Sequence, residues 1–175
     1  KEINRKNNSI IILGGNFKEH FFTKYDWKYI ASENISIEES FKKSVLKLLS
    51  NNKVILIYPI PSLDFNLQKR IMNELPKSTF KATHYLEKNP YTTNYKMYLN
   101  ENDKILSFFN KIKHKNLIKI FPDEIFCNKS ENICFSHEGK NLYYSDPQHL
   151  SLSGSEMLSN KIFDEIKKIT LNKDL

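Results

Sequence analysis

The chain has 175 residues, 39% of them apolar, and a formal net charge of +7. This length suits one domain with its own core, and no apolar run approaches the roughly 20 residues that a membrane helix needs. Only two arginines occur and the lysines are scattered among Asn and Ile, so the charge favours solvated basic faces over nucleic-acid binding. No signal peptide is visible. Because the chain does not begin with Met, we expect a processed product or a piece of something longer.

The first predicted element is a strand at residues 9–13, which ends in Gly14-Gly15-Asn16. A continuous apolar run without alternation is typical of a buried strand in a parallel sheet. The two glycines allow a sharp turn or a close approach to a ligand. Asn16 offers an amide at the carboxyl end of the strand, where open α/β sheets build their sites. The alternative is that Asn16 is only a turn residue.

A helix is predicted over 37–50 and a second buried strand over 53–59. Ser36 and Glu39 have the spacing of a capping box, and apolar residues follow at helical spacing. Strand, helix and strand within about 50 residues predict a βαβ unit with parallel strands.

The rest of the chain predicts further helices and strands. Helices are expected over 67–75 and 91–112, and a third short strand over 117–122. A small hairpin is expected within 135–144, around a turn at its glycine. The segment 153–156 has a capping-box pattern, which predicts a closing amphipathic helix behind it.

Two cysteines, Cys127 and Cys134, lie in a segment with the character of a loop. They could form a zinc site, but four ligands are usual and His137 supplies at most a third. They could also be two buried thiols. We favour a short-loop disulfide, which implies an oxidising compartment.

The candidate catalytic residues are Asp146 and His149, in a turn that contains a proline. A carboxylate beside an imidazole fixes the tautomer of the ring and stabilises its protonated form, which prepares the histidine to act as a general base. The alternative is a helix-capping loop in which the histidine is merely polar.

The order of these features resembles the SGNH (GDSL-like) hydrolase superfamily. It looks most like the SGNH domain fused behind membrane acyltransferases of the acyltransferase-3 type, which O-acylate bacterial surface glycans. Three features carry the resemblance: the strand-to-proline segment 54–61, the cysteine pair Cys127 and Cys134, and the block Asp-Pro-Gln-His-Leu-Ser-Leu-Ser-Gly at 146–154.

The resemblance implies an α/β fold with three α/β/α layers and a mainly parallel, flavodoxin-like sheet. The SGNH-like domain would span 9–171, after a linker or frayed start at 1–8 and before a tail at 172–175. The first one or two strands of the sheet would lie upstream, so that the chain is the C-terminal portion of the domain.

By resemblance, His149 is the general base and Asp146 orients it, while Asn16 and Gly15 fall near the block that supplies an oxyanion-hole Asn. The chain departs from the family because no Gly-Asp-Ser occurs in it, and Ser9 precedes a strand and is a poor substitute. The nucleophile therefore lies upstream, or catalysis is lost.

The resemblance further implies an O-acyltransferase with an acyl donor delivered by a fused or partner membrane domain, a glycan acceptor, no cofactor and no metal. It implies a periplasmic or extracytoplasmic location. The alternatives are a stand-alone esterase and an inactive SGNH-fold binding domain. A nucleotide-binding domain is disfavoured because no glycine-rich phosphate loop occurs.

Overall fold

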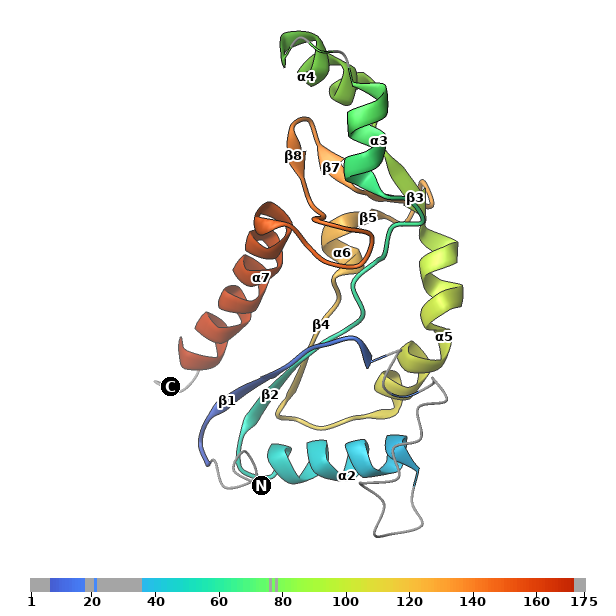
Figure 1. The fold of residues 1–175 in the computed structure, drawn as a ribbon. Helices are drawn as coiled ribbons and strands as arrows, with labels where there is room; N and C mark the ends of the chain where they lie inside the picture. The colour runs from blue at the N-terminus through green and yellow to red at the C-terminus, as the bar shows by residue number, and fades with distance from the viewer. Residues whose placement is uncertain (1–6, 18–20, 22–35, 76, 78, 172–175) are drawn as a thin grey trace. The chain divides into compact units, whose positions relative to one another are not determined.

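The computed structural model is shown in Figure 1. The predicted linker at 1–8 falls mostly outside the residues that it describes, and the predicted tail at 172–175 falls wholly outside them. The described residues are 7–17, 21, 36–75, 77 and 79–171.

The chain divides into two compact units, and each is built from two stretches of sequence. The first unit comprises Lys1–Pro59 and Asn102–Ile120, and the second comprises Ile60–Glu101 and Phe121–Leu175. The parallel sheet lies in the first unit, and Asp146 and His149 lie in the second.

The first unit contains a parallel sheet of three strands in the order β1-β2-β4. These strands are β1 (Ile10–Leu13), β2 (Lys53–Ile57) and β4 (Leu117–Ile120). Both strand pairs are parallel, as the uninterrupted apolar runs predict. The predicted α/β fold with a mainly parallel sheet is confirmed.

The middle strand β2 has the most buried side chains of the sheet. Val54, Ile55 and Leu56 have no exposed surface, because β2 has a neighbouring strand on each side. Ile55 pairs with Ile12 of β1 and with Ile118 of β4.

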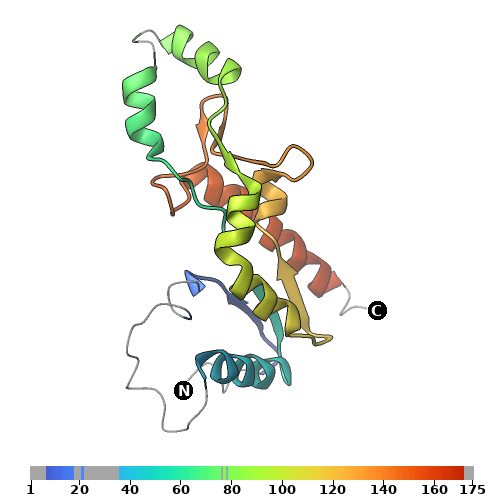
Figure 2. The same ribbon diagram turned by 90° about the vertical axis from the view of Figure 1, so that its right-hand side faces the viewer.

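Helix α2 (Ile37–Leu49) connects β1 to β2, so the predicted βαβ unit is confirmed. Ser36 is its N-cap, and the Ser36 hydroxyl oxygen accepts a hydrogen bond of 3.1 Å from the backbone N–H of Glu39. The helix buries one apolar stripe, which includes Val45 and Leu49. In Figures 1 and 2 it lies along one side of β1 and β2.

Aromatic rings form a cluster in the first unit. Phe41 of α2 contacts Phe17, with ring centroids 5.7 Å apart, and stacks on Phe109 at 5.8 Å. Phe109 lies in α5 (Tyr95–Lys111). These edge and stacked contacts join two helices to the segment that follows β1.

The helix predicted over 91–112 is shorter at its start. Residues Thr92–Asn94 form strand β3, and the helix α5 begins at Tyr95. The side-chain oxygen of Asn94 accepts a hydrogen bond of 2.8 Å from the backbone N–H of Lys96. Asn94 therefore satisfies an N–H group at the start of the helix, as N-cap residues do.

The second unit contains a small antiparallel sheet in the order β3-β6-β5. Strand β5 (Cys127–Asn128) forms a hairpin with β6 (Ile133–Phe135), and β6 also pairs with β3. The prediction that the two cysteines lie in a loop is wrong, because they occupy opposing positions on β5 and β6.

Two short helices and a hairpin also belong to this unit. Helices α3 (Leu67–Glu74) and α4 (Thr79–Lys88) follow one another, as Figure 2 shows, and α3 matches the predicted helix. Strands β7 (His137–Glu138) and β8 (Asn141–Leu142) form the predicted hairpin.

The core of the second unit combines aromatic and aliphatic side chains from several of these elements and from helix α6 (Asp123–Phe126). Tyr144 and Phe126 contact each other at a ring-centroid distance of 6.0 Å. Its buried members are Leu63, Leu67, Leu86, Tyr91, Phe126, Tyr143 and Tyr144. The core thus reaches directly to the segment that carries Asp146 and His149.

Candidate active site

Asp146 and His149 are hydrogen-bonded to each other in the segment between β8 and the closing helix α7 (Leu152–Leu171) (Figure 1). The Nδ1 atom of His149 lies 2.7 Å from Oδ2 of Asp146. A neutral imidazole in this contact carries its proton on Nδ1, because a carboxylate only accepts. The Nε2 atom then has its lone pair available to take a proton.

The second carboxylate oxygen of Asp146 holds the turn itself. Oδ1 accepts hydrogen bonds from the backbone N–H groups of Gln148, at 2.8 Å, and His149, at 2.9 Å. One carboxylate therefore fixes both the backbone and the ring of His149. This double use explains why the two residues are three positions apart, with a proline between them.

The dyad is open to solvent. The side chain of His149 is 76% exposed and that of Asp146 is 46% exposed. The pKa of Asp146 is lowered, first by the hydrogen bond from the Gln148 backbone and then by the bond to the His149 ring. Asp146 therefore remains a carboxylate at neutral pH and can stabilise the protonated ring.

Backbone hydrogen bonds close the loop around the dyad. The N–H of Ser145 donates to the carbonyl of His149 at 2.9 Å. Tyr144 and Leu150 form an isolated antiparallel bridge. The two ends of the loop are therefore clamped together, which limits the positions that the ring can take.

Two further bonds fasten this loop to the segment that follows β2. The buried hydroxyl of Tyr144 donates to the carbonyl of Pro61 at 2.7 Å. The N–H of Leu63 donates to the carbonyl of Pro147 at 2.8 Å. Burial raises the pKa of Tyr144, so its hydroxyl stays protonated and keeps donating.

Ser151 and Gly154 connect the loop to α7. The Ser151 hydroxyl oxygen accepts from the N–H of Gly154 at 3.2 Å, and it also donates to the carbonyl of Leu142. The helix starts at Leu152. The predicted capping box at 153–156 is therefore wrong, because the Ser151 side chain accepts the N–H of Gly154 at the start of the helix instead.

Gly154 has a steric role in the same block. A Cβ atom at this position would meet the carbonyl oxygen of Tyr143 at 2.2 Å and its carbonyl carbon at 3.0 Å. The Tyr143 oxygen also accepts the N–H of Ser151 at 2.8 Å. The sequence alone did not identify Ser151 and Gly154 as supports of the dyad, although both lie within the block 146–154.

Cys127 and Cys134 form a disulfide in the structure. Among the described residues, no group of three or more metal-binding side chains is brought together. His137, considered above as a third ligand, is 3% exposed. Its Nε2 accepts the backbone N–H of Tyr91 at 3.0 Å, and its Nδ1 donates to the carbonyl of Gly139 at 2.9 Å.

Gly15 and Asn16 follow β1 in the first unit, whereas the dyad belongs to the second. Both residues are exposed. The carbonyl of Gly15 accepts the N–H of Phe17 at 3.0 Å, so the chain turns here as expected after a strand. Their contribution to an oxyanion hole stays a prediction.

The observed features define a parallel-sheet α/β domain with an oriented Asp–His pair at the start of its closing helix. Residues 1–164 match the family of SGNH domains that are fused to AT3 domains. The chain belongs to this family, as its sequence predicts.

A solved structure supports the fold. It is the periplasmic domain of the lipopolysaccharide acetyltransferase of Salmonella ser. Paratyphi A, with a TM-score of 0.53 and 18% sequence identity. The similarity covers 94% of this chain and 59% of the Salmonella chain, so this chain spans about three fifths of that domain. A comparison with curated proteins gives no match.

The part of the chain that the structure describes contains no helix that is both long and apolar enough to cross a membrane.

Proposed function

We propose that this chain is part of the SGNH domain of a bacterial O-acyltransferase that transfers an acyl group, such as acetyl, to a cell-surface glycan. The contact of 2.7 Å between Asp146 and His149 carries the proposal, because it prepares one ring nitrogen to move a proton. The family's fusion to AT3 domains supports acyl transfer as the reaction class.

In this reaction His149 acts first as a base. Its Nε2 takes the proton of a serine hydroxyl while the serine oxygen attacks the acyl carbonyl of the donor. Backbone N–H groups stabilise the oxyanion. The imidazolium, held by Asp146, gives the proton to the leaving group. A glycan hydroxyl then attacks the acyl-enzyme and passes its proton to Nε2, and the returning proton frees the serine.

The serine is proposed to come from outside these 175 residues. No Gly-Asp-Ser occurs in the sequence. This chain spans 59% of the solved Salmonella domain, which supports a serine from a further part of the domain. His149 and Asp146 are then the acid–base half of a Ser-His-Asp arrangement.

The acyl donor is proposed to reach the domain from a fused or partner membrane domain, on the periplasmic or extracytoplasmic face. The family's AT3 fusion supports such a donor. The disulfide between Cys127 and Cys134 supports an oxidising location, because disulfides persist outside the cytoplasm.

The lack of a Gly-Asp-Ser favours a second candidate function. In it the domain keeps the SGNH fold and binds a glycan, but performs no chemistry. A third candidate, a stand-alone esterase, shares the dyad and differs only in that water takes the place of the glycan hydroxyl.

Acyl transfer by the membrane protein that contains this chain tests the proposal. A donor with an isotope-labelled acyl group is supplied, and the label on the glycan is followed by mass spectrometry. The variant His149→Ala is expected to transfer about 10²–10⁴-fold more slowly, which is the usual contribution of a general base. The control is His84→Ala, which removes an exposed histidine of α4.

The outcomes separate the three candidates. A rate in His149→Ala equal to that of the unmodified protein refutes the proposed role of the dyad. Label released as free acid, with none on the glycan, identifies an esterase. Glycan binding without any consumption of donor identifies a binding domain.

A further inference from the structure

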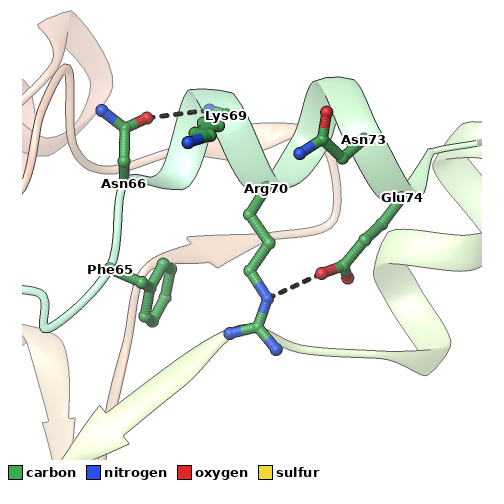
Figure 3. Close-up of a pocket in the computed structure, with 6 residues that line it drawn as sticks. All are labelled: Phe65, Asn66, Lys69, Arg70, Asn73 and Glu74. Carbon is green, nitrogen blue, oxygen red and sulfur yellow. Dashed lines mark hydrogen bonds and ion pairs between the residues drawn. The ribbon is translucent and has the colours of Figure 1, made fainter.

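Helix α3 forms one wall of a shallow pocket that takes no part in the reaction described above. The pocket has a volume of about 390 Å³. Figure 3 shows the residues that line it: Phe65, Asn66, Lys69, Arg70, Asn73 and Glu74. All of them come from one stretch of the second unit, so the pocket is formed within a single compact body.

Several contacts hold the Arg70 side chain in this pocket. Its guanidinium carbon lies 5.0 Å from the ring centroid of Phe65 and 4.8 Å from that of Tyr91. Its Nε donates to Glu74 at 3.0 Å, and the hydroxyl of Tyr91 donates to the other oxygen of Glu74 at 2.8 Å. Figure 3 shows the terminal nitrogens of Arg70 pointing away from the helix. They are donors whose position is fixed before any ligand arrives.

The pocket offers acceptors as well as donors. The hydrogen bond from Tyr91 lowers the pKa of Glu74 most strongly, with Arg70 adding to the effect, so Glu74 is a carboxylate. Asn73 supplies an amide with both functions, and Lys69 supplies an ammonium donor. The Glu74 carboxylate would repel a fully anionic group.

We propose that this pocket binds a neutral sugar unit of the glycan acceptor. Only the identification of the sugar as the acceptor rests on the proposed function. Each sugar hydroxyl both donates and accepts, which matches Arg70, Asn73 and Glu74. The apolar side of a sugar ring matches the ring of Phe65. Apolar surface with a few fixed polar groups is the usual composition of a ligand site.

The position of the pocket within the second unit suits this role. Leu63 donates to the carbonyl of Pro147 at 2.8 Å. Phe65 follows Leu63 by two residues, and His149 follows Pro147 by two residues. Two residues span at most about 7 Å, so Phe65 of the pocket and His149 of the dyad each lie a short stretch of chain away from this one hydrogen bond.

Nuclear magnetic resonance titration of the ¹⁵N-labelled 175-residue chain tests the proposal. The probes are the methyl glycosides of glucose, galactose, mannose, rhamnose and N-acetylglucosamine, with methyl glucuronide and inorganic phosphate as anionic probes. At least one neutral glycoside is expected to shift the side-chain signals of Asn73 and Arg70 in a saturable manner. The absence of such shifts with every neutral glycoside, or shifts with the anionic probes alone, overturns the proposal.

A pair of double variants checks where the sugar binds. Lys69→Ala with Asn73→Ala removes two exposed polar side chains of the pocket, and is expected to weaken binding about tenfold. Met72→Ala with Lys81→Ala is the control, because both residues are exposed and neither lines the pocket. Equal weakening in both pairs also overturns the assignment. Binding needs no serine, so its failure leaves the acyl-transfer proposal standing, and the reverse holds as well.

Discussion

Replacing Gly154 by alanine sets helix propensity against the packing of the dyad loop. Propensity alone predicts that Gly154→Ala stabilises a helix by about 1 kcal/mol. The added Cβ, however, would lie 2.2 Å from the carbonyl oxygen of Tyr143. Because this neighbour is backbone, α7 or the loop must move. Overpacking of this kind costs about 1–3 kcal/mol, occasionally more. Because the contact of 2.2 Å is with backbone, we take the upper end of this cost, about 3 kcal/mol, and expect a net loss of about 2 kcal/mol.

Thermal unfolding of the 175-residue chain, followed by circular dichroism, measures this loss. A change of 2 kcal/mol lowers the melting temperature by about 4–8 °C in a chain of this size. The control is Ser155→Ala, one residue further along α7 at an exposed position. A Gly154→Ala variant as stable as the unmodified chain, or more stable, would refute the steric role of Gly154.

Three further changes test the second unit. Burial lowers the pKa of His137 from its ordinary 6.5. As the pH falls, the unfolded chain therefore binds a proton at His137 before the folded chain does. Stability should fall as the pH drops below about 6.5, and the slope should be smaller in His137→Gln when measured by urea unfolding. Replacing both Cys127 and Cys134 by serine removes the disulfide. The free energy of unfolding should fall by about 2.5 kcal/mol for a loop of this length. Tyr144→Phe leaves a buried carbonyl without its donor and should cost about 1–3 kcal/mol by urea unfolding. For the cysteine and tyrosine variants, an unchanged midpoint of urea unfolding contradicts the contact. For His137→Gln, an unchanged dependence of stability on pH does so.

The elements that the sequence predicts well are those with a strong local signal. The apolar runs at β1 and β2 have no alternation, and the structure places both in a parallel sheet. Ser36 and the residues after it match a capping pattern, and the helix begins as expected. In these segments local preference and burial in the core favour the same structure.

The elements that the sequence does not predict depend on contacts between distant residues. Strand β3 has three residues, and it pairs with β6 about 40 positions later. Neither segment has a strand pattern of its own. His137 is satisfied by two backbone groups, those of Tyr91 and Gly139, which no spacing of residue types reveals. The sequence pattern also puts the start of α7 too late. The Ser151 hydroxyl is positioned by its hydrogen bond to the carbonyl of Leu142, nine residues earlier.

The candidate site shows the same division. The spacing of Asp146 and His149 indicates a pair, but the spacing does not show that Asp146 also holds the turn through Gln148. The pocket on α3 has no sequence signature at all. Its arginine becomes a fixed donor only because the rings of Phe65 and Tyr91, which contact each other, both lie against it.

The tautomer of the His149 ring reports directly on what Asp146 does to it. At a pH where the ring is neutral, ¹⁵N spectra distinguish a proton on Nδ1 from a proton on Nε2. The contact with Asp146 predicts that the proton is on Nδ1, which leaves Nε2 able to act as a base. Asp146→Asn should shift the proton to Nε2, because the amide no longer selects the tautomer. A ring protonated mainly on Nε2 in the unmodified chain would contradict the assignment of this pair as a general base and its orienting carboxylate.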